Sequence, residues 1–115
     1  MWVSEHFKRE EFACHCNCGQ DTVDVELILI LEDLREHFGV PVVINSGNRC
    51  VLHNAEIGGA KKSQHVRSKA ADIVVKGVES REVYSYLNEI YPDRYGMGLY
   101  VDFVHIDCRS ERRRW

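Results

Sequence analysis

The sequence predicts a single α+β domain that spans residues 1–115, on three observations. Residues 24–38 and the segment between Ser80 and Pro92 carry apolar side chains at helical spacing, four short apolar runs have strand length, and no internal repeat relates them. The length of 115 residues fits one domain. The chain is 44% hydrophobic and 29% charged, with two prolines and eight glycines, which argues against a disordered or fibrous protein.

The first elements are helical. A short helix capped by Ser4 is predicted near the start of the chain. The clearest helix is predicted from Asp24 to about Phe38, because Asp24 suits an N-cap and Gly39 suits the left-handed residue that ends many helices. One face of this helix carries the apolar side chains Leu27, Leu31, Leu34 and Phe38.

The remaining elements mix strands with helices. They are predicted in this order: a strand over 41–44, a turn over 46–48, a short helix over 51–57, a buried strand over 70–75, a helix capped by Ser80 and ended by Pro92, and two strands over 97–101 and 103–108 joined around Asp102. Two main helices, short helices and about four strands make an α+β layout with a small antiparallel sheet.

The charge and hydropathy patterns exclude several classes of protein. The net charge of −3 argues against a generally basic nucleic-acid binder. No apolar run approaches the roughly 18 residues of a membrane span. Residues 1–12 are too charged for the apolar core of a signal peptide. We therefore expect a protein made in the cytoplasm, without a membrane span.

Five cysteines and six histidines are many potential metal ligands for a short chain. An odd number of cysteines cannot all pair within one chain, and a reducing cytoplasm favours free thiols or metal ligands. Three cysteines alternate and a fourth follows Arg49; they are Cys14, Cys16, Cys18 and Cys50. A structural metal bound by these four is one interpretation, and free thiols or a disulfide are the others.

A second constellation lies on two predicted strands. His65 precedes Asp72 by seven residues, and His105 lies in the last strand. Polar residues within such apolar runs are costly to bury unless they are paired or bound to a metal. A catalytic zinc needs three ligands of N, O or S type and one open position. The spacing therefore indicates a shared metal, and its alternative is a buried hydrogen-bonded pair.

Several motifs together resemble the zinc D-Ala-D-Ala carboxypeptidase family of metallopeptidases, over nearly the whole chain. They are Ser46-Gly47-Asn48-Arg49, His53-Asn54, Gly58-Gly59-Ala60, Ser63-Gln64-His65, Ala70-Ala71-Asp72-Ile73 and Phe103-Val104-His105-Ile106-Asp107. The small phage and prophage members are most similar, and the family includes endolysins. The resemblance implies the α+β fold of DD-peptidases and of the hedgehog signalling domain.

The resemblance also implies roles for individual residues. His65, Asp72 and His105 match the three zinc ligands. Arg49 matches an arginine that stabilises the oxyanion and grips the substrate, as a permanent positive charge is suited to do. Ser63 matches a residue beside the metal that contacts the peptide.

The general base is open between two carboxylates. Asp102 stands three residues before the last histidine, where many family members carry the acid. Strand parity complicates the choice of Asp102, because Asp107 shares a face with His105 and Asp102 does not, so Asp102 needs a turn or bulge just before Phe103 to reach the metal. Asp107 is the alternative base, or else a partner that orients a histidine or arginine. One position departs from the family: Ser68 stands where glycine is usual, so the loop there must keep a negative φ or accept strain.

The implied function is zinc-dependent hydrolysis of a peptide bond in a peptidoglycan stem peptide, as a carboxypeptidase or an endopeptidase. His53 on the short helix is a further candidate for substrate binding. We expect a monomer that reaches the cell wall after lysis, through a holin or in a phage particle. One rival is a non-catalytic zinc-stabilised binding module of the same fold. The other is a cysteine-rich module that binds nucleic acid through the arginines of residues 109–114, which the acidic net charge disfavours.

Overall fold

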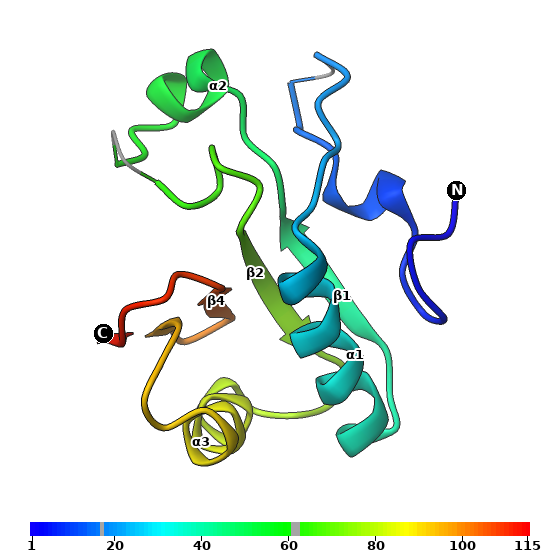
Figure 1. Cartoon of the computed structure of the whole chain (residues 1–115), viewed down its shortest axis with the longest axis vertical. Coiled ribbons are helices and arrows are strands. Elements are labelled where there is room, and N and C mark those ends of the chain that lie inside the picture. The colour runs from blue at the N-terminus through cyan, green and yellow to red at the C-terminus, as the bar shows by residue number, and fades with distance from the viewer. Residues whose placement is uncertain (17, 61–62) are drawn as a thin grey trace.

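The computed structural model describes residues 1–16, 18–60 and 63–115. Its elements are the 3-10 helix η1 (Arg9–Phe12), the helices α1 (Val25–Phe38), α2 (Val51–Glu56) and α3 (Ser80–Ile90), and the strands β1 (Val42–Ser46), β2 (Ala70–Val75), β3 (Gly96–Leu99), β4 (Val104–Asp107) and β5 (Arg113–Arg114). Figure 1 shows α1 beside β1 and β2, with α2 and α3 at opposite ends of the molecule. Within the described ranges, no helix is long and apolar enough to cross a bilayer.

The sheet confirms the α+β class but corrects the predicted antiparallel sheet. Its strand order is β1-β2-β4-β3-β5, and every pair is antiparallel except β3 with β5, which is parallel. The fifth strand comes from the arginine-rich end of the chain. Main-chain bonds fix it there, from Arg113 N to Tyr95 O (3.0 Å) and from Trp115 N to Met97 O (3.0 Å). A two-residue strand has no periodicity from which to predict it.

The predicted boundaries of α1 are confirmed to within one residue. The Asp24 carboxylate accepts a hydrogen bond from Glu26 N (2.9 Å), as an N-cap does. Gly39 has φ 67° and donates its N–H to Arg35 O (3.0 Å). Leu31 and Leu34 on the apolar face are fully buried. Local sequence signals at both ends of this helix therefore act as they do in isolated helices.

Replacing Gly39 by alanine is expected to lower the free energy of unfolding by about 1 kcal/mol, because a β-carbon penalises the left-handed conformation. A β-carbon at Gly39 would meet no atom within 4 Å, so the cost comes from the backbone alone. Urea denaturation measures the change. Gly39→Asn is the control and should lose less, since asparagine tolerates this conformation. An alanine variant as stable as the parent would contradict this account.

Two predicted helix caps are wrong. Ser80 is the first residue of α3 rather than its cap, and its hydroxyl donates to Val101 O (3.2 Å). Ser4 caps no helix, because its hydroxyl donates to the Glu32 carboxylate and the first helix starts only at Arg9. Both serines bond to residues distant in the sequence, which a local capping pattern cannot reveal.

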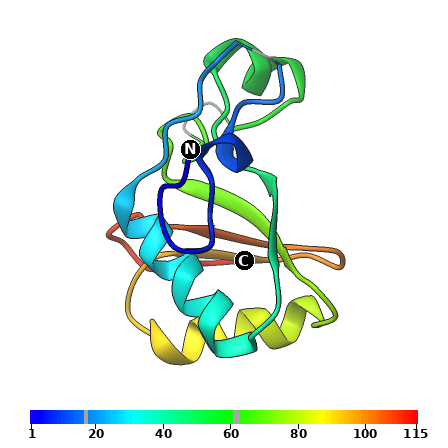
Figure 2. The same ribbon diagram turned by 90° about the vertical axis from the view of Figure 1, so that its right-hand side faces the viewer.

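The two faces of the sheet differ in chemistry. Ile73 of β2 and Ile106 of β4 point into the hydrophobic core, on the face covered by α1 and α3. Figure 2 shows both helices on one side of the sheet. The intervening residues Asp72 and His105 point to the other face, where they are direct cross-strand partners. The alternation of β2 and β4 therefore places two polar side chains together outside the core.

Candidate active site

The structure brings together the three residues predicted as metal ligands. Asp72 Oδ1 lies 3.2 Å from His65 Nε2 and 3.0 Å from His105 Nδ1. The three candidate ligand atoms all lie within 4.8 Å of one another. Asp72 comes from β2, His105 from the neighbouring strand β4, and His65 from the turn that leads into β2. Two strands and one loop thus converge on a single point.

Both histidines are oriented by their second ring nitrogen. His65 Nδ1 lies 2.8 Å from Gly47 O, to which it donates, so Nε2 is the ring nitrogen that faces Asp72. His105 Nε2 lies 2.8 Å from Asp107 Oδ2, so the free nitrogen of His105 is Nδ1. Histidines that bind zinc are commonly held in this way by a carbonyl or a carboxylate. Two oriented imidazoles and one carboxylate fit the ligand set of a catalytic zinc.

Asp107 is a supporting residue behind His105. Its side chain is fully buried, and it accepts bonds from Gly96 N (3.1 Å), Arg109 Nε (2.8 Å) and Arg109 Nη2 (2.7 Å). Although burial opposes ionisation, the hydrogen bonds of His105 and Arg109 hold the pKa of Asp107 below its usual range. A β-carbon at Gly96 would lie 2.3 Å from Asp107 Oδ2, so only glycine leaves room for this carboxylate.

The charge of Asp72 suits a cation. Burial raises the pKa of Asp72, but the hydrogen bonds of His105 and His65 outweigh that effect and hold the pKa below its usual range. In the metal-free chain, burial lowers the pKa of His105, but the hydrogen bonds to Asp107 and Asp72 outweigh that effect and raise the pKa above its usual value. Asp72 is therefore ionised at neutral pH, as a metal ligand must be.

The three residues open into a pocket of about 870 Å³. Its wall is rich in positive charge and in aromatic rings, from Arg49, Arg67, Arg109, Arg113, Arg114, Tyr100, Phe103 and Trp115. The Trp115 indole donates to the Tyr100 hydroxyl (2.9 Å), and its ring centroid lies 5.0 Å from that of His105. Such a wall suits a ligand that carries carboxylates.

Arg49 and Ser63, for which substrate contacts were predicted, both line this pocket. Arg49 N donates to His65 O (3.1 Å), which ties the arginine to the loop that carries a candidate ligand. Its buried Nε has no hydrogen-bond partner among the described residues. Burial lowers the pKa of Arg49 while the charge of Asp72 raises it, and a guanidinium stays charged under such shifts. Ser63 Oγ accepts from His65 N (3.2 Å).

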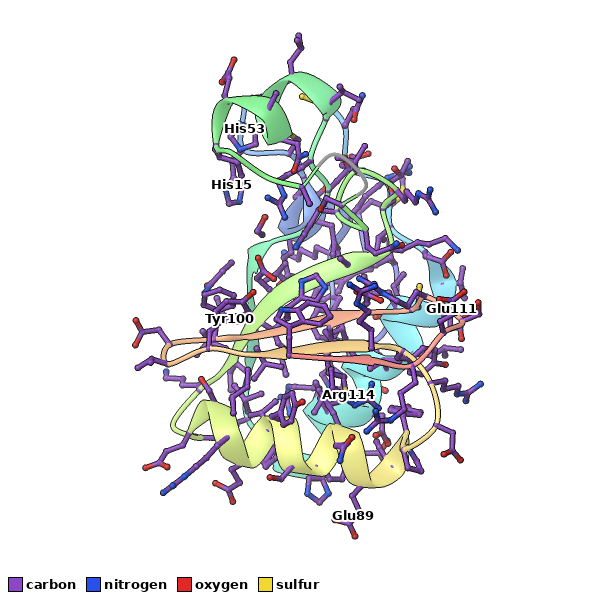
Figure 3. The ribbon with its side chains drawn as sticks, turned by 90° about the vertical axis from the view of Figure 1, so that its left-hand side faces the viewer. His15, His53, Glu89, Tyr100, Glu111 and Arg114 are labelled. Carbon is purple, nitrogen blue, oxygen red and sulfur yellow. The ribbon has the colours of Figure 1, made fainter. Side chains whose placement is uncertain are left out.

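Two predicted site residues lie elsewhere in the structure. Asp102 is exposed in the turn between β3 and β4, and His53 lies on α2 with its ring 6.4 Å from that of His15. Figure 3 shows His15 and His53 together near α2, apart from the sheet. Within the described part of the chain, neither Asp102 nor His53 lines the pocket. Their roles stay predictions.

Two further residues beside the site went unpredicted. Arg109 was grouped with the charged C-terminal end, although it forms a two-bond pair with Asp107. Trp115 offered no signal, because an aromatic residue at the end of a sequence has no pattern around it. The spacing Asp107-x-Arg109 was the one sequence signal that could have indicated the pair between these two residues.

Ser68 resolves the departure from the family pattern. Its φ is 62°, so the loop accepts a left-handed serine where glycine is usual. The hydroxyl lies 2.7 Å from Thr22 Oγ1 and accepts from Asn48 Nδ2 at 2.7 Å. These contacts offset a backbone cost of about 1–2 kcal/mol. The turn that positions His65 is therefore kept with a different residue.

Comparison with known proteins agrees with the geometry. The family model described as Peptidase M15 matches residues 5–107. A search among individual curated proteins found no significant match. The family is the zinc D-Ala-D-Ala carboxypeptidase type, whose members are zinc-dependent. Because the match covers most of the chain, from before η1 to the end of β4, this chain belongs to the Peptidase M15 family of metallopeptidases.

Proposed function

We propose that the protein hydrolyses a peptide bond in the stem or cross-link peptides of bacterial peptidoglycan, with zinc held by His65, Asp72 and His105. The observation that carries the proposal is the convergence of these ligand atoms within 4.8 Å at a pocket with an arginine-rich wall. Bound zinc supplies Lewis acidity and lowers the pKa of a coordinated water toward about 7. The proposed substrate class rests on the family match and on the positively charged wall of the pocket.

In this proposal Arg49 stabilises negative charge on the scissile carbonyl oxygen or holds a substrate carboxylate. Its Nε has no hydrogen-bond partner among the described residues, and this and its position beside the His65 loop support that role. Donors that are in place before the reaction stabilise a developing oxyanion without reorganisation. Ser63 contacts the peptide beside the metal, and the rings of Tyr100 and Trp115 border the bound chain.

Asp102 is the proposed general base. It is exposed in the β3–β4 turn, so its role is the part of the proposal that most needs a test. The rival carboxylate, Asp107, already uses both oxygens on His105, Gly96 and Arg109. Approach of Asp102 to the substrate requires the turn that carries it to lie over the pocket when the peptide binds. Catalytic contacts commonly tighten only in the substrate complex.

Asp102→Asn is expected to keep the zinc and to lower turnover of muropeptides by about 10²–10⁴-fold, because the amide cannot accept the proton. Zinc content and single-turnover hydrolysis measure the two effects separately. Asp93→Asn, an exposed carboxylate outside the pocket, is the matched control. Unchanged turnover in the Asp102 variant would move the base to another group.

A second candidate function has one observation in its favour. Asp72 is the sole carboxylate among the described residues that line the pocket. A pocket without a second acid suits a zinc-stabilised module that binds peptides without cutting them, a use known for the hedgehog domain that shares the proposed fold. Arg49 and the arginine-rich wall would then bind the carboxylates of the cell wall.

Mass spectrometry of purified peptidoglycan after digestion separates the two functions. New soluble fragments would identify the bond cut, and with it carboxypeptidase or endopeptidase action. Retention of the protein on the wall without any fragment would favour the binding module. We propose a monomeric, single-domain enzyme of phage or prophage origin, made in the cytoplasm and brought to the wall by lysis, by a holin or in a particle.

A further inference from the structure

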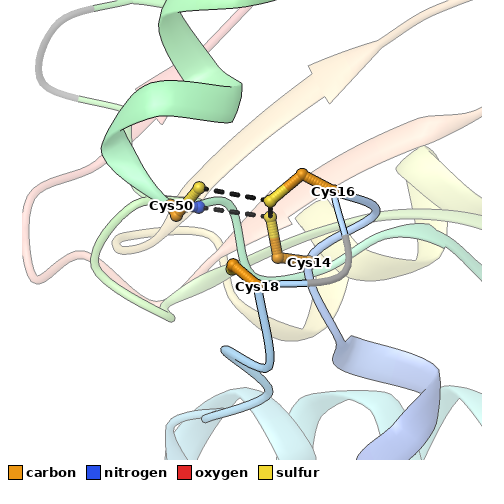
Figure 4. A group of neighbouring side chains, drawn as sticks. All are labelled: Cys14, Cys16, Cys18 and Cys50. Carbon is orange, nitrogen blue, oxygen red and sulfur yellow. Dashed lines mark hydrogen bonds between the residues drawn. The ribbon is translucent and has the colours of Figure 1, made fainter.

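Four cysteines gather at a second place, away from the pocket; they are Cys14, Cys16, Cys18 and Cys50, here called the four-cysteine cluster (Figure 4). Cys16 Sγ lies 3.4 Å from both Cys14 Sγ and Cys50 Sγ. All four sulfurs lie within 4.8 Å of one another. Cys14 and Cys50 are buried, whereas Cys16 and Cys18 are exposed. The first three come from the loop after η1, and Cys50 is the N-cap of α2.

Backbone contacts bring the two buried cysteines together. Asn48 N donates to Phe12 O (2.8 Å), and a β-carbon at Gly47 would lie only 2.7 Å from Phe12 Cα. The segment after β1 therefore runs directly against the end of η1. Cys14 follows Phe12 by two residues, and Cys50 follows Asn48 by two. The fold therefore brings Cys14 and Cys50 together independently of what their thiols bind.

The spacing of the sulfurs suits one tetrahedral ion. Four sulfurs at about 2.3 Å from a zinc centre lie about 3.8 Å apart, close to the separations in the cluster. The 3.4 Å contacts are far longer than the S–S bond of about 2.05 Å, so these cysteines are free thiols in the structure. Soft thiolates in a tetrahedral set select zinc over the hard cations.

Backbone N–H groups point at the sulfurs of both buried cysteines. Cys50 N donates to Cys14 Sγ (3.4 Å), and His53 N donates to Cys50 Sγ (3.3 Å). N–H donors stabilise a negatively charged sulfur. Metal ligands are commonly held by such outer contacts. The donors come from the N-cap and the first turn of α2, so the start of this helix also contacts the cluster.

We propose that the four-cysteine cluster binds one structural zinc ion, which fastens the loop after η1 to the start of α2. The ion closes a site with no open ligand position, as structural zinc sites do. It also fixes Arg49, which directly precedes Cys50 and reaches into the pocket. The site shares no ligand with His65, Asp72 and His105, so it does not depend on the proposed peptidase activity.

The test is the zinc content of purified protein, with and without the two exposed ligands. Cys16→Ser/Cys18→Ser leaves no cavity in the core, so the variant is expected to fold. We expect about two zinc ions per chain in the parent, about one in the double variant, about one in His65→Ala, and none when all three changes are combined. Cobalt replacement adds a second readout, because only the cysteine site gives a sulfur-to-cobalt charge-transfer band.

Cys108→Ala is the matched control, since Cys108 is a buried thiol outside the cluster and should keep both zinc ions. Its neighbours Asp24 and Glu26 are already used by the fold, one as the cap of α1 and the other as acceptor of the Tyr95 hydroxyl (2.6 Å).

Three results would overturn the inference: a Cys16/Cys18 variant with the zinc content of the parent, iron in place of zinc, or fewer than five titratable thiols in the denatured, chelator-treated chain. Zinc lost only on removal of the cysteines, and not in His65→Ala, would support this site and contradict the catalytic one.

Discussion

His65→Ala is expected to remove the zinc of the active site and to lower peptidase turnover by at least about 10³-fold. His65 is 1% exposed, and its Nδ1 is fixed by Gly47 O, so the alanine variant removes a proposed ligand that the fold holds in place. Asp72 and His105 alone leave the ion with two protein ligands, fewer than the three of catalytic zinc sites. Without the ion, the pKa of the attacking water rises back toward that of bulk water.

The measurement combines metal analysis with release of soluble muropeptides, and circular dichroism checks that the variant is folded. His37→Ala is the matched control: this histidine stacks on Tyr86, with ring centroids 3.7 Å apart, and lies outside the pocket. It should keep the zinc and the turnover of the parent. If the His65 variant kept its full zinc content, the ligand assignment would be wrong.

Local signals in the sequence were sufficient for some elements. The bounds of α1 follow from Asp24 and Gly39, which act within one turn of the helix ends. The predicted strand over 70–75 coincides with β2, because the polar loops on either side mark both ends of this apolar run. In the structure, the period-2 alternation of β2 and β4 puts Asp72 and His105 on the same side of the sheet, where they meet as cross-strand partners.

Contacts between residues distant in the sequence could not be predicted from it. Strand β5 pairs with β3 through main-chain bonds, which carry no side-chain pattern. The hydroxyls of Ser4 and Ser80 donate to Glu32 and Val101 instead of capping a helix, so the two predicted caps were wrong. The sequence did offer Asp107 as a partner that orients a histidine, and the structure places its carboxylate against His105 Nε2. The Gly47 carbonyl that holds His65 could not be predicted in this way, because its position depends on the fold.

Asp107→Ala is expected to weaken zinc binding by about 10–100-fold and to destabilise the metal-free protein by about 3–5 kcal/mol. The first effect arises because His105 Nε2 loses its acceptor, so the ring no longer presents Nδ1 in one orientation. The second arises because Arg109 loses both of its side-chain bonds to Asp107 and keeps a partly buried charge. Zinc titration and urea denaturation measure the two effects.

The matched control for this change is Asp107→Asn, which keeps an acceptor for His105 but removes the charge that pairs with Arg109. It should retain more zinc affinity than Asp107→Ala. Equal zinc affinity in the parent and both variants would show that Asp107 does not orient His105.

The charge of Asp107 also predicts how stability depends on pH. Because the pKa of Asp107 is depressed in the folded state, the stability it contributes is present above the unfolded pKa of about 3.9 and is lost as the pH falls below it. The metal-free parent should therefore lose stability steeply below about pH 4, whereas Asp107→Asn should have a shallower slope there because it has no proton to bind at this position. An identical slope in both proteins would mean that the buried pair with Arg109 contributes no charge-dependent stability.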